Sequence, residues 1–597
     1  MKKKQLFHRF SKTVAIAILT AALLLSGCTS AQDATTESVV TASESTSVSA
    51  VQTVASVDAA NTALVSSLDT SDMFSDRDQK TDYDESECIL ITLNGDSASC
   101  DGKGVTVEAG TVIIKEAGNY ILRGSFNGSI RVETAEDAKV WLILDGVTIT
   151  SNGTAAIYAK TADKVFVTTA KDSKNTITNT GDFAAIDENN IDGAIYSKCD
   201  LTLNGNGTLV VSSEKGHGIV SKDDLKITSG TYEITAGDHG ISGKDSIRIL
   251  DGSITITSTE DGLHSGNDED ADKGYVYIAN GNIKINAGDD AIHGESRVVI
   301  ANGTIDVAKC TEGIEAAIVE IAGGDVNVVA SDDGINATDG SGTEGFGGGR
   351  GGFGQAGSKD ATSSSVNTNV YIMISGGKVT VDAQGDGIDS NGALYVSGGE
   401  VYVNGPENSG NGALDYDSKA EITGGTLIAI GSSGMAMNFS SSTQGSALVT
   451  FSESHAAGET VQLKDSKGNV IVSFVSARKF STVVVSSPLM KQGETYTLTS
   501  GSESKEFTLD QLLYGNGSGG FGGFGGQGGQ MPGGQMPGGQ MPGGKGGFDS
   551  QKPEGFDGQR PEGFDKNFEG GMPSFPGGSD GERQRPSRPE GKSSDET

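Results

Sequence analysis

Basic side chains are scarce in this chain of 597 residues: 44 lysines and arginines stand against 79 aspartates and glutamates, a formal net charge of −35. This balance excludes nucleic acid as an expected partner, because phosphate binding needs clustered basic residues. Glycine is frequent, with 88 residues, but it lacks the three-residue period of collagen. No repeat carries an apolar stripe with helical spacing, which excludes leucine-rich, ankyrin and tetratricopeptide arrays. A chain this acidic is expected to meet cationic partners or to bind metal cations.

Cysteines are few and widely spaced. Cys88 and Cys100 flank a hairpin-like stretch, so the sequence leaves open either a disulfide between them or two free thiols. Cys199 and Cys310 lie too many repeats apart to pair, and we expect both to be buried thiols. The fifth cysteine, Cys28, lies near the start of the chain.

The chain contains one turn repeated many times, in which Gly or Ala precedes an aliphatic residue. The aliphatic positions are Ile219, Ile241, Leu263, Ile292, Ile314, Ile335, Ile388 and Leu414. Those at 219, 241 and 263 are 22 residues apart, and those at 292, 314 and 335 are 22 and 21 residues apart. Longer intervals contain insertions, of which the largest is the Gly/Ser-rich run of residues 340–365. A fixed period of this length is typical of a solenoid.

Each repeat also contains a glycine followed by a short alternating segment, as in residues 303–307 and 399–403. Alternation with β-branched residues predicts strands, and the Gly, Asn and Asp clusters between them predict turns. We therefore predict an all-β fold, a right-handed parallel β-helix with coils stacked about 4.8 Å apart. The ladder begins at residues 156–158, and residues 84–150 supply the first coils and a cap over the open strand edge.

Composition divides the chain into five segments. They are a lipoprotein signal peptide at 1–28, a Ser/Thr-rich disordered linker at 29–82, the parallel β-helix at 83–440, a small C-terminal β cap at 441–512, and a Gly/Met/Pro-rich disordered tail at 513–597. The linker and the tail are predicted to be disordered because they contain too few apolar residues to bury a core.

The first segment predicts export and lipidation. Several basic residues precede an apolar run at residues 14–25, which is typical of a secretory signal. The four residues 25–28, Leu-Ser-Gly-Cys, resemble a bacterial lipobox. The resemblance implies cleavage before Cys28 and acylation of its sulfur with chains such as palmitate, which would hold the protein on the extracellular face of the cell membrane. An uncleaved membrane anchor is the alternative.

Polar residues form two columns beside the aliphatic ladder. Two positions before it stand His217, His239, Asp261, Asp290, Glu312, Asp333 and Asp386. One position after it stand His264, His293, Glu315, Asn336, Asp389 and Asp415. Stacking of the coils would place four of the six histidines and many acids along one border.

Stacked carboxylates repel one another, by about 0.9 kcal/mol at 4.8 Å in water and about 3.5 kcal/mol at an effective dielectric constant of 20. A divalent cation removes this cost, and Ca²⁺ suits hard oxygen ligands in irregular geometry. The candidate calcium ligands are Asp261, Asp289, Asp290, Glu312, Glu315, Asp332, Asp333, Asp386, Asp389 and Asp415. The alternative for any single aspartate is that it caps a turn by accepting backbone N–H groups.

Histidines and lysines are the candidate ligand-binding residues. We interpret His217, His239, His264 and His293 as stacking rings or hydrogen-bond partners of a sugar, with packing in the turns, or a transition metal without cysteine, as alternatives. A basic column follows the ladder at Lys160, Lys198, Lys222 and Lys244. Of these, Lys222 and Lys244 are candidates to hold the carboxylates of an anionic polymer. The alternative is that the lysines only balance Asp163, Asp200, Asp223 and Asp245.

The repeated Asp-Gly-Ile/Leu turns, the segment at residues 144–149 and the Gly/Met-rich tail resemble a bacterial family of surface carbohydrate-binding β-helix proteins. The resemblance spans residues 84–440. It implies a fold related to pectate lyases and calcium-dependent binding of polygalacturonate-like polymers such as pectin.

We therefore expect a monomeric surface lipoprotein that binds acidic polysaccharide through calcium, without catalysis. One alternative is a calcium-dependent polysaccharide lyase, which needs a base near calcium to remove a proton from the uronate. Lys244, Arg297 and Lys309 lie near the columns in sequence, but none is singled out as that base. The other alternative is a structural or adhesive surface protein.

Overall fold

The computed structural model describes residues 68–100, 102–184, 190–339 and 369–515. All of them fall in one compact unit, Met1–Gly523. The predicted signal peptide with Cys28, the linker up to residue 67 and the tail beyond residue 515 lie outside the described residues. Within the described ranges, no helix has the length and apolar character needed to cross a membrane.

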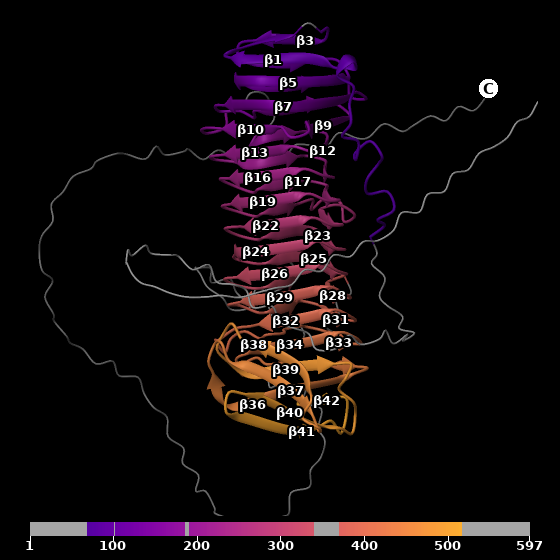
Figure 1. Cartoon of the computed structure of the whole chain (residues 1–597), viewed down its shortest axis with the longest axis vertical. Coiled ribbons are helices and arrows are strands. Elements are labelled where there is room, and N and C mark those ends of the chain that lie inside the picture. Colours follow the sequence, from indigo (N-terminus) through magenta and orange to yellow (C-terminus); the bar gives the residue numbers. More distant parts are fainter. Residues whose placement is uncertain (1–67, 101, 185–189, 340–368, 516–597) are drawn as a thin grey trace, which may run out of the picture. The chain divides into compact units, whose positions relative to one another are not determined.

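The described chain winds into a parallel β-helix, as the repeat predicts (Figure 1). Each coil contributes a strand to three stacks, and strands within a stack pair in parallel with the next coil. The first stack consists of β8 (Ile157–Thr161), β11 (Gly193–Ser197), β14 (His217–Ser221), β17 (Ile241–Gly243), β20 (Leu263–Ser265), β23 (Ile292–Ile300), β25 (Ile314–Ile321), β27 (Ile335–Ala337) and β30 (Ile388–Ser390).

The second and third stacks complete each coil. The second consists of β9 (Lys164–Thr169), β12 (Asp200–Gly205), β15 (Asp224–Ile227), β18 (Ser246–Ile249), β21 (Tyr275–Ile278), the later parts of β23 and β25, β28 (Tyr371–Ile374), β31 (Ala393–Val396), β33 (Lys419–Ile422) and β35 (Ser441–Ser442). The third consists of β10 (Lys174–Asn179), β13 (Thr208–Ser213), β16 (Thr231–Ala236), β19 (Ser253–Ser258), β22 (Asn282–Asn286), β24 (Thr304–Cys310), β26 (Asp325–Ala330), β29 (Lys378–Ala383), β32 (Glu400–Asn404) and β34 (Thr426–Gly431).

The aliphatic ladder forms the inner side of the first stack. Ile219 pairs with Ile241, and the pairing continues through every predicted ladder position to Leu414. These side chains are fully buried, and each contributes about 1.5–3 kcal/mol relative to an exposed position. The glycine before the ladder residue is needed for close stacking: a Cβ on Gly313 would lie 2.0 Å from the carbonyl oxygen of Gly334.

The N-terminal coils begin with two antiparallel pairs. The elements are η1 (Glu85–Glu87), β1 (Ile89–Gly95), β2 (Ser97–Cys100), β3 (Val105–Glu108), β4 (Thr111–Ile114), β5 (Gly118–Asn127), β6 (Ser129–Glu133) and β7 (Lys139–Ser151). β1 pairs with β2 and β3 with β4 in antiparallel fashion, whereas β5, β6 and β7 join the parallel stacks.

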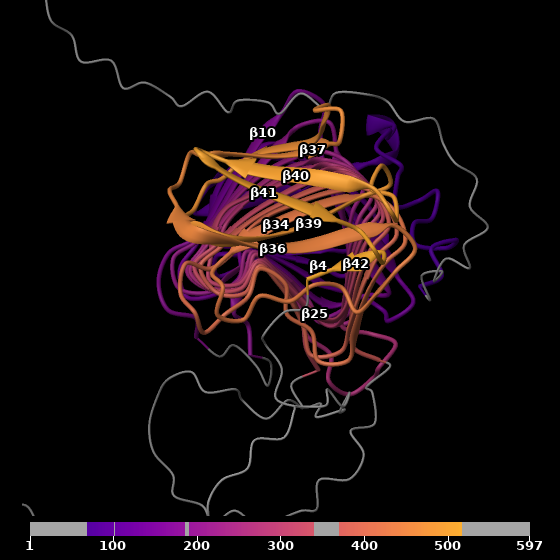
Figure 2. The same ribbon diagram turned by 90° about the horizontal axis from the view of Figure 1, so that it is seen from below.

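Most of the C-terminal strands pair antiparallel with their neighbours, unlike the parallel strands of the coils. The C-terminal strands are β36 (Gly445–His455), β37 (Thr460–Asp465), β38 (Val470–Val475), β39 (Phe480–Ser487), β40 (Thr495–Ser500), β41 (Glu503–Thr508) and β42 (Leu513–Tyr514). β39 pairs antiparallel with β34 and with β36, so it covers the edge of the last coil of the third stack (Figure 2). β38, β37, β40 and β41 form a separate four-stranded sheet in that order.

All four cysteines in the described residues are free. Cys199 and Cys310 are buried thiols, as predicted. The disulfide alternative for Cys88 and Cys100 is wrong, because Cys100 pairs across the hairpin with Ile91, three residues beyond Cys88. The two sulfurs instead contact backbone oxygens of Asp84 and Gly102.

Residues 68–83, here called the strap, correct the predicted extent of the disordered linker. They form no strand, yet they pack on the outside of the second stack. Met73 is buried in a cluster with Tyr275, Tyr277 and Val299. The sequence signal for this contact is weak, because the strap has few apolar residues and no periodicity.

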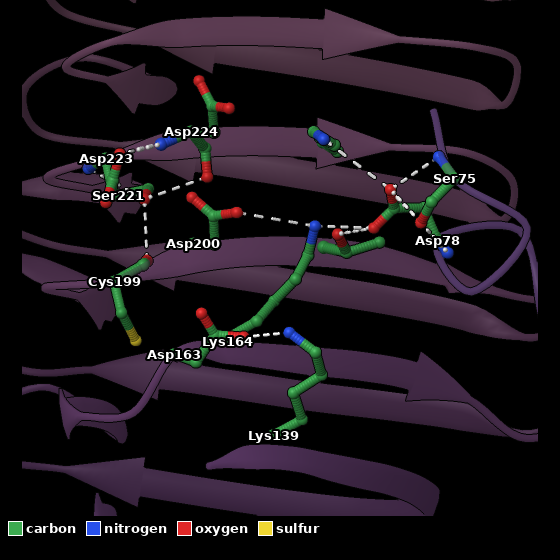
Figure 3. A network of polar contacts seen from close by, with 12 residues as sticks. Ser75, Asp78, Lys139, Asp163, Lys164, Cys199, Asp200, Ser221, Asp223 and Asp224 are labelled. Carbon is green, nitrogen blue, oxygen red and sulfur yellow. Dashed lines mark hydrogen bonds and ion pairs between the residues drawn. The ribbon is translucent and has the colours of Figure 1, made fainter. Parts of the chain in front are cut away.

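The strap is held mainly by Asp78, whose side chain is only 1 % exposed (Figure 3). Its carboxylate oxygens lie 2.7 Å from Lys164 Nζ and 3.6 Å from Lys226 Nζ. Thr202 Oγ1 donates to the carboxylate at 2.8 Å, and Asn204 Nδ2 donates to the Asp78 carbonyl at 2.8 Å. These contacts hold the pKa of Asp78 well below its ordinary value despite its burial, so the carboxylate is charged and fully paired.

Candidate functional site

Two columns of polar side chains run along the first stack and together form the polar edge. Strand register aligns the column after the ladder, from His264 to His293, Glu315, Asn336 and Asp389. The column before the ladder is aligned by backbone hydrogen bonds between successive coils. For example, Gly240 N–H donates to the Asp261 carbonyl oxygen, and Gly262 N–H donates to the Asp290 carbonyl oxygen. The histidine half consists of His217, His239, Asp261, His264, Asp290 and His293; the acidic half consists of Glu312, Glu315, Asp333, Asn336, Asp386, Asp389 and Asp415.

Several of these side chains cap a turn, because one of their atoms accepts a hydrogen bond from a backbone N–H group. His217 Nδ1 accepts from His239 N–H at 3.2 Å, and His239 Nδ1 accepts from Asp261 N–H at 3.1 Å. In the acidic half, Asp333 Oδ1 accepts from Asp386 N–H at 2.6 Å. Each carboxylate still has a second oxygen, so capping does not exhaust its binding capacity.

Four imidazole rings stack along the histidine half. Neighbouring ring centroids from His217 to His239, His264 and His293 lie 5.0, 4.2 and 5.1 Å apart, and neighbouring planes differ by 2°, 6° and 11°. The spacing follows the separation of adjacent strands. The rings stack on one another, and their binding of a sugar stays a prediction.

The rings differ in protonation. Burial lowers the pKa of both His217 and His239 to about 4, so both are neutral at pH 7. His264 Nδ1 lies 2.6 Å from Asp261 Oδ2, and His293 Nδ1 lies 3.0 Å from Asp290 Oδ2. Burial lowers the pKa of His293, but its hydrogen bond to Asp290 and the charges of Asp290, Asp261 and Glu295 together raise it above its ordinary value.

Carboxylates crowd together in the acidic half. Asp333, Asp386 and Asp389 each place an oxygen within 4.8 Å of the other two. Burial, followed by repulsion from neighbouring acids, raises the pKa of Asp333 to about 7 and of Asp389 to about 8. Burial also raises the pKa of Asp386 to about 6. The cluster therefore resists full ionisation in the absence of a cation.

Asn336 lies between the glutamates Glu312 and Glu315 and the aspartate cluster of the acidic half. Its Nδ2 donates to Glu312 Oε2 at 3.0 Å and to Glu315 Oε2 at 3.4 Å. Its Oδ1 is buried and has no hydrogen-bond partner among the described residues. A buried carbonyl-type oxygen without a donor is costly, and the strand register places Asn336 beside Asp389. Asn336 Oδ1 is thus an unpartnered oxygen on the strand next to that of Asp389.

The raised carboxyl pKa values predict how the cation-free protein responds to pH. A carboxyl whose pKa is higher in the folded than in the unfolded state loses stabilisation as pH rises through the folded value. His217 and His239 have the opposite effect, but only below their unfolded pKa of about 6.5. We expect the free energy of unfolding in chelator to fall between pH 6.5 and 8, by up to about 1.4 kcal/mol per pH unit for each titrating group. Urea titrations measure this, and a flat or rising profile would contradict it.

The remaining predicted residues lie at or near the edge. Asp289 and Asp332 are exposed at its rim, and burial raises the pKa of each. Asp415 lies at the last coil, where its charge raises the pKa of Asp386 and Asp389. Lys222 lies 3.8 Å from Asp192, and Lys244 Nζ lies 3.0 Å from Glu269.

The balancing partners that the sequence suggested for the lysines are found only in part. Glu269, followed by Asp245, raises the pKa of Lys244, so Asp245 acts on this lysine as suggested. Lys160 contacts Glu133, and Lys222 also lies over the ring of Tyr196. Binding of an anionic polymer by Lys222 and Lys244 stays a prediction.

Sequence reasoning missed two carboxylates of the histidine half. Asp238 Oδ1 lies 3.4 Å from His217 Nδ1 and 3.7 Å from His239 Nε2. Asp192 Oδ2 lies 3.8 Å from His217 Nε2. Both stand three positions before a ladder residue, as Asp289 and Asp332 do, so this third column was the signal that could have found them.

Comparisons with known proteins support the resemblance to carbohydrate-binding proteins. A solved structure described as a polysaccharide lyase-like protein from C. thermocellum, a gadolinium derivative, is 35% identical and aligns with 40% of this chain and 93% of its own. Its TM-score is 0.36, too low to support a fold assignment, which comes here from strand pairing.

A curated protein of Acetivibrio thermocellus, named as a carbohydrate-binding domain-containing protein, is 36% identical over 150 residues. The matched region is 24% of this chain, and the chain spans about half (52%) of the length of that relative. Residues 108–356, which include the histidine half of the polar edge, match the family model described as carbohydrate-binding domain-containing protein.

Proposed function

We propose that this protein binds an acidic, polygalacturonate-like polysaccharide through calcium ions held in the acidic half of the polar edge. We also propose that a lipid on Cys28 tethers it to the extracellular face of the cell membrane. Calcium would bridge protein carboxylates and uronate carboxylates, which reconciles an acidic protein with an acidic ligand. The similarity of residues 108–356 to carbohydrate-binding domains supports a sugar ligand.

The donor set fits calcium. Asp333, Asp386 and Asp389 offer converging carboxylate oxygens, and the unpartnered Oδ1 of Asn336 lies on the adjacent strand. All four donors are hard oxygens, which suit Ca²⁺ better than a transition metal. The observation that carries the proposal is the convergence of three half-buried carboxylates, whose raised pKa values reflect burial and neighbouring acids. Polymer and water oxygens would complete the six to eight ligands that calcium takes.

The test is to apply the full chain to immobilised polygalacturonate with calcium and then with chelator, while ultraviolet absorbance monitors unsaturated product. We expect retention in calcium, release in chelator and constant absorbance. Steady growth of absorbance would replace binding with lyase activity. Failure to bind any acidic polymer, with calcium-dependent stability intact, would favour a structural role.

A further inference from the structure

We propose that the histidine half binds one d-block divalent cation of the zinc class, with His239 as the shared ligand of two neighbouring triplets. The first triplet is His217, Asp238 and His239; the second is His239, Asp261 and His264. This site is separate from the calcium site proposed for the acidic half, and it uses nitrogen as well as oxygen donors. The two triplets use different nitrogens of His239, Nε2 and Nδ1, but a neutral ring carries a proton on one of them, so these two triplets take a single ion.

The first triplet has the spacing of metal ligands rather than of hydrogen bonds. Asp238 Oδ1 lies 3.4 Å from His217 Nδ1 and 3.7 Å from His239 Nε2. These separations exceed an ordinary hydrogen bond. Ligands bound to zinc at about 2.0–2.2 Å in tetrahedral geometry lie about 3.4 Å apart, so the separations suit an ion, which would take the place of the His239 backbone N–H that His217 Nδ1 accepts.

The second triplet lies on the other side of His239. Asp261 Oδ2 lies 3.3 Å from His239 Nδ1 and 2.6 Å from His264 Nδ1. The shorter contact is a hydrogen bond, which an ion would have to open. Neighbouring rings are nearly parallel in both triplets, so an ion held by two rings requires one ring to tilt in either case.

The charge around the rings favours a cation here. Asp192, Asp238 and Asp261 surround the rings, whereas Lys222 is the basic residue beside Asp192. Asp192 approaches His217 at Nε2, on the opposite side of the ring from the Nδ1 of the first triplet, so it adds negative charge without being a ligand.

The choice between calcium and a d-block ion follows from the donors. Imidazole nitrogen suits zinc, copper and nickel, whereas calcium takes oxygen ligands. The polar edge thus changes its metal preference along its length, from nitrogen and oxygen at His217–His264 to oxygen alone at Asp333–Asp389.

The experiment loads the metal-free full chain with Zn²⁺ or Ca²⁺ in separate titrations and records the visible spectrum with Co²⁺. We expect one zinc per chain and cobalt bands of nitrogen and oxygen coordination. His239→Gln should weaken zinc by at least the ~10–100-fold typical of losing an outer-shell partner, with calcium affinity unchanged. Asp389→Asn should do the reverse. Asp238→Asn, at the most exposed ligand of the first triplet, gives a second variant with a smaller zinc loss should His239→Gln fail to fold.

The matched pair of variants keeps this proposal separate from the proposed function. Loss of calcium binding with zinc intact would overturn only the calcium site. Zinc affinity unchanged in both Asp238→Asn and His239→Gln would overturn the histidine site, as would a sulfur-to-cobalt charge-transfer band, which would place the ion on a cysteine.

Discussion

Asp389→Asn is expected to make the calcium-free protein more stable and to abolish its response to calcium. Burial and repulsion from Asp386, Asp333 and Asp415 raise the pKa of Asp389 to about 8. Folding at pH 7 must therefore protonate this carboxyl or bury its charge, which costs up to about 4 kcal/mol relative to an unfolded chain with an ordinary pKa. An amide of the same shape does not carry that cost, but it replaces an anionic calcium ligand with a neutral one.

The measurement is thermal or urea unfolding of wild type and variant, each in chelator and in calcium. Calcium should stabilise the wild type and leave the variant nearly unchanged, because a ligand stabilises only the state that binds it. Asp325→Asn, at an exposed aspartate of β26 outside the polar edge, serves as the matched control. A variant less stable than wild type in chelator, or one with a full calcium response, would contradict the account.

Asp78→Ala is expected to destabilise the fold by about 3–5 kcal/mol, the range for breaking a buried ion pair by removing one partner. Lys164 and Lys226 would remain nearly buried without their carboxylate, and Thr202 would lose its acceptor. Urea unfolding measures the loss.

Two comparisons make the strap prediction specific. Asp76→Ala changes an exposed acid of the strap and should alter stability by no more than about 0.5 kcal/mol. Adding Lys164→Met to Asp78→Ala should recover part of the loss, since an apolar side chain of similar length needs no partner. Equal effects of the Asp76 and Asp78 variants would show that the strap contributes little.

The repeat predicted much of the fold because its period fixes which residues stack. Ladder positions from Ile219 to Leu414 were all found in register, since a parallel coil places equivalent positions directly above one another. The strap was missed because Asp78 contacts Lys164 and Thr202, which are 86 and 124 positions away in the chain, through side chains alone. No periodic pattern reports such a contact.

The repeat period also predicted part of the candidate site. Period and offset identified the two columns, and the order of residues placed the histidines in the earlier coils. They could not show which acids pair with imidazoles, such as Asp261 with His239 and His264. Of the ten candidate calcium ligands, Asp261 and Asp290 contact imidazoles, whereas Asp333, Asp386 and Asp389 form the oxygen-only cluster.

The most direct test of the account is a crystal structure of the calcium-loaded protein with anomalous data that identify the ions. The account predicts a calcium ion bound by Asp333, Asp386 and Asp389, with Asn336 Oδ1 turned toward it. Empty density among these carboxylates at millimolar calcium would contradict the central claim that acids from successive coils share the ion.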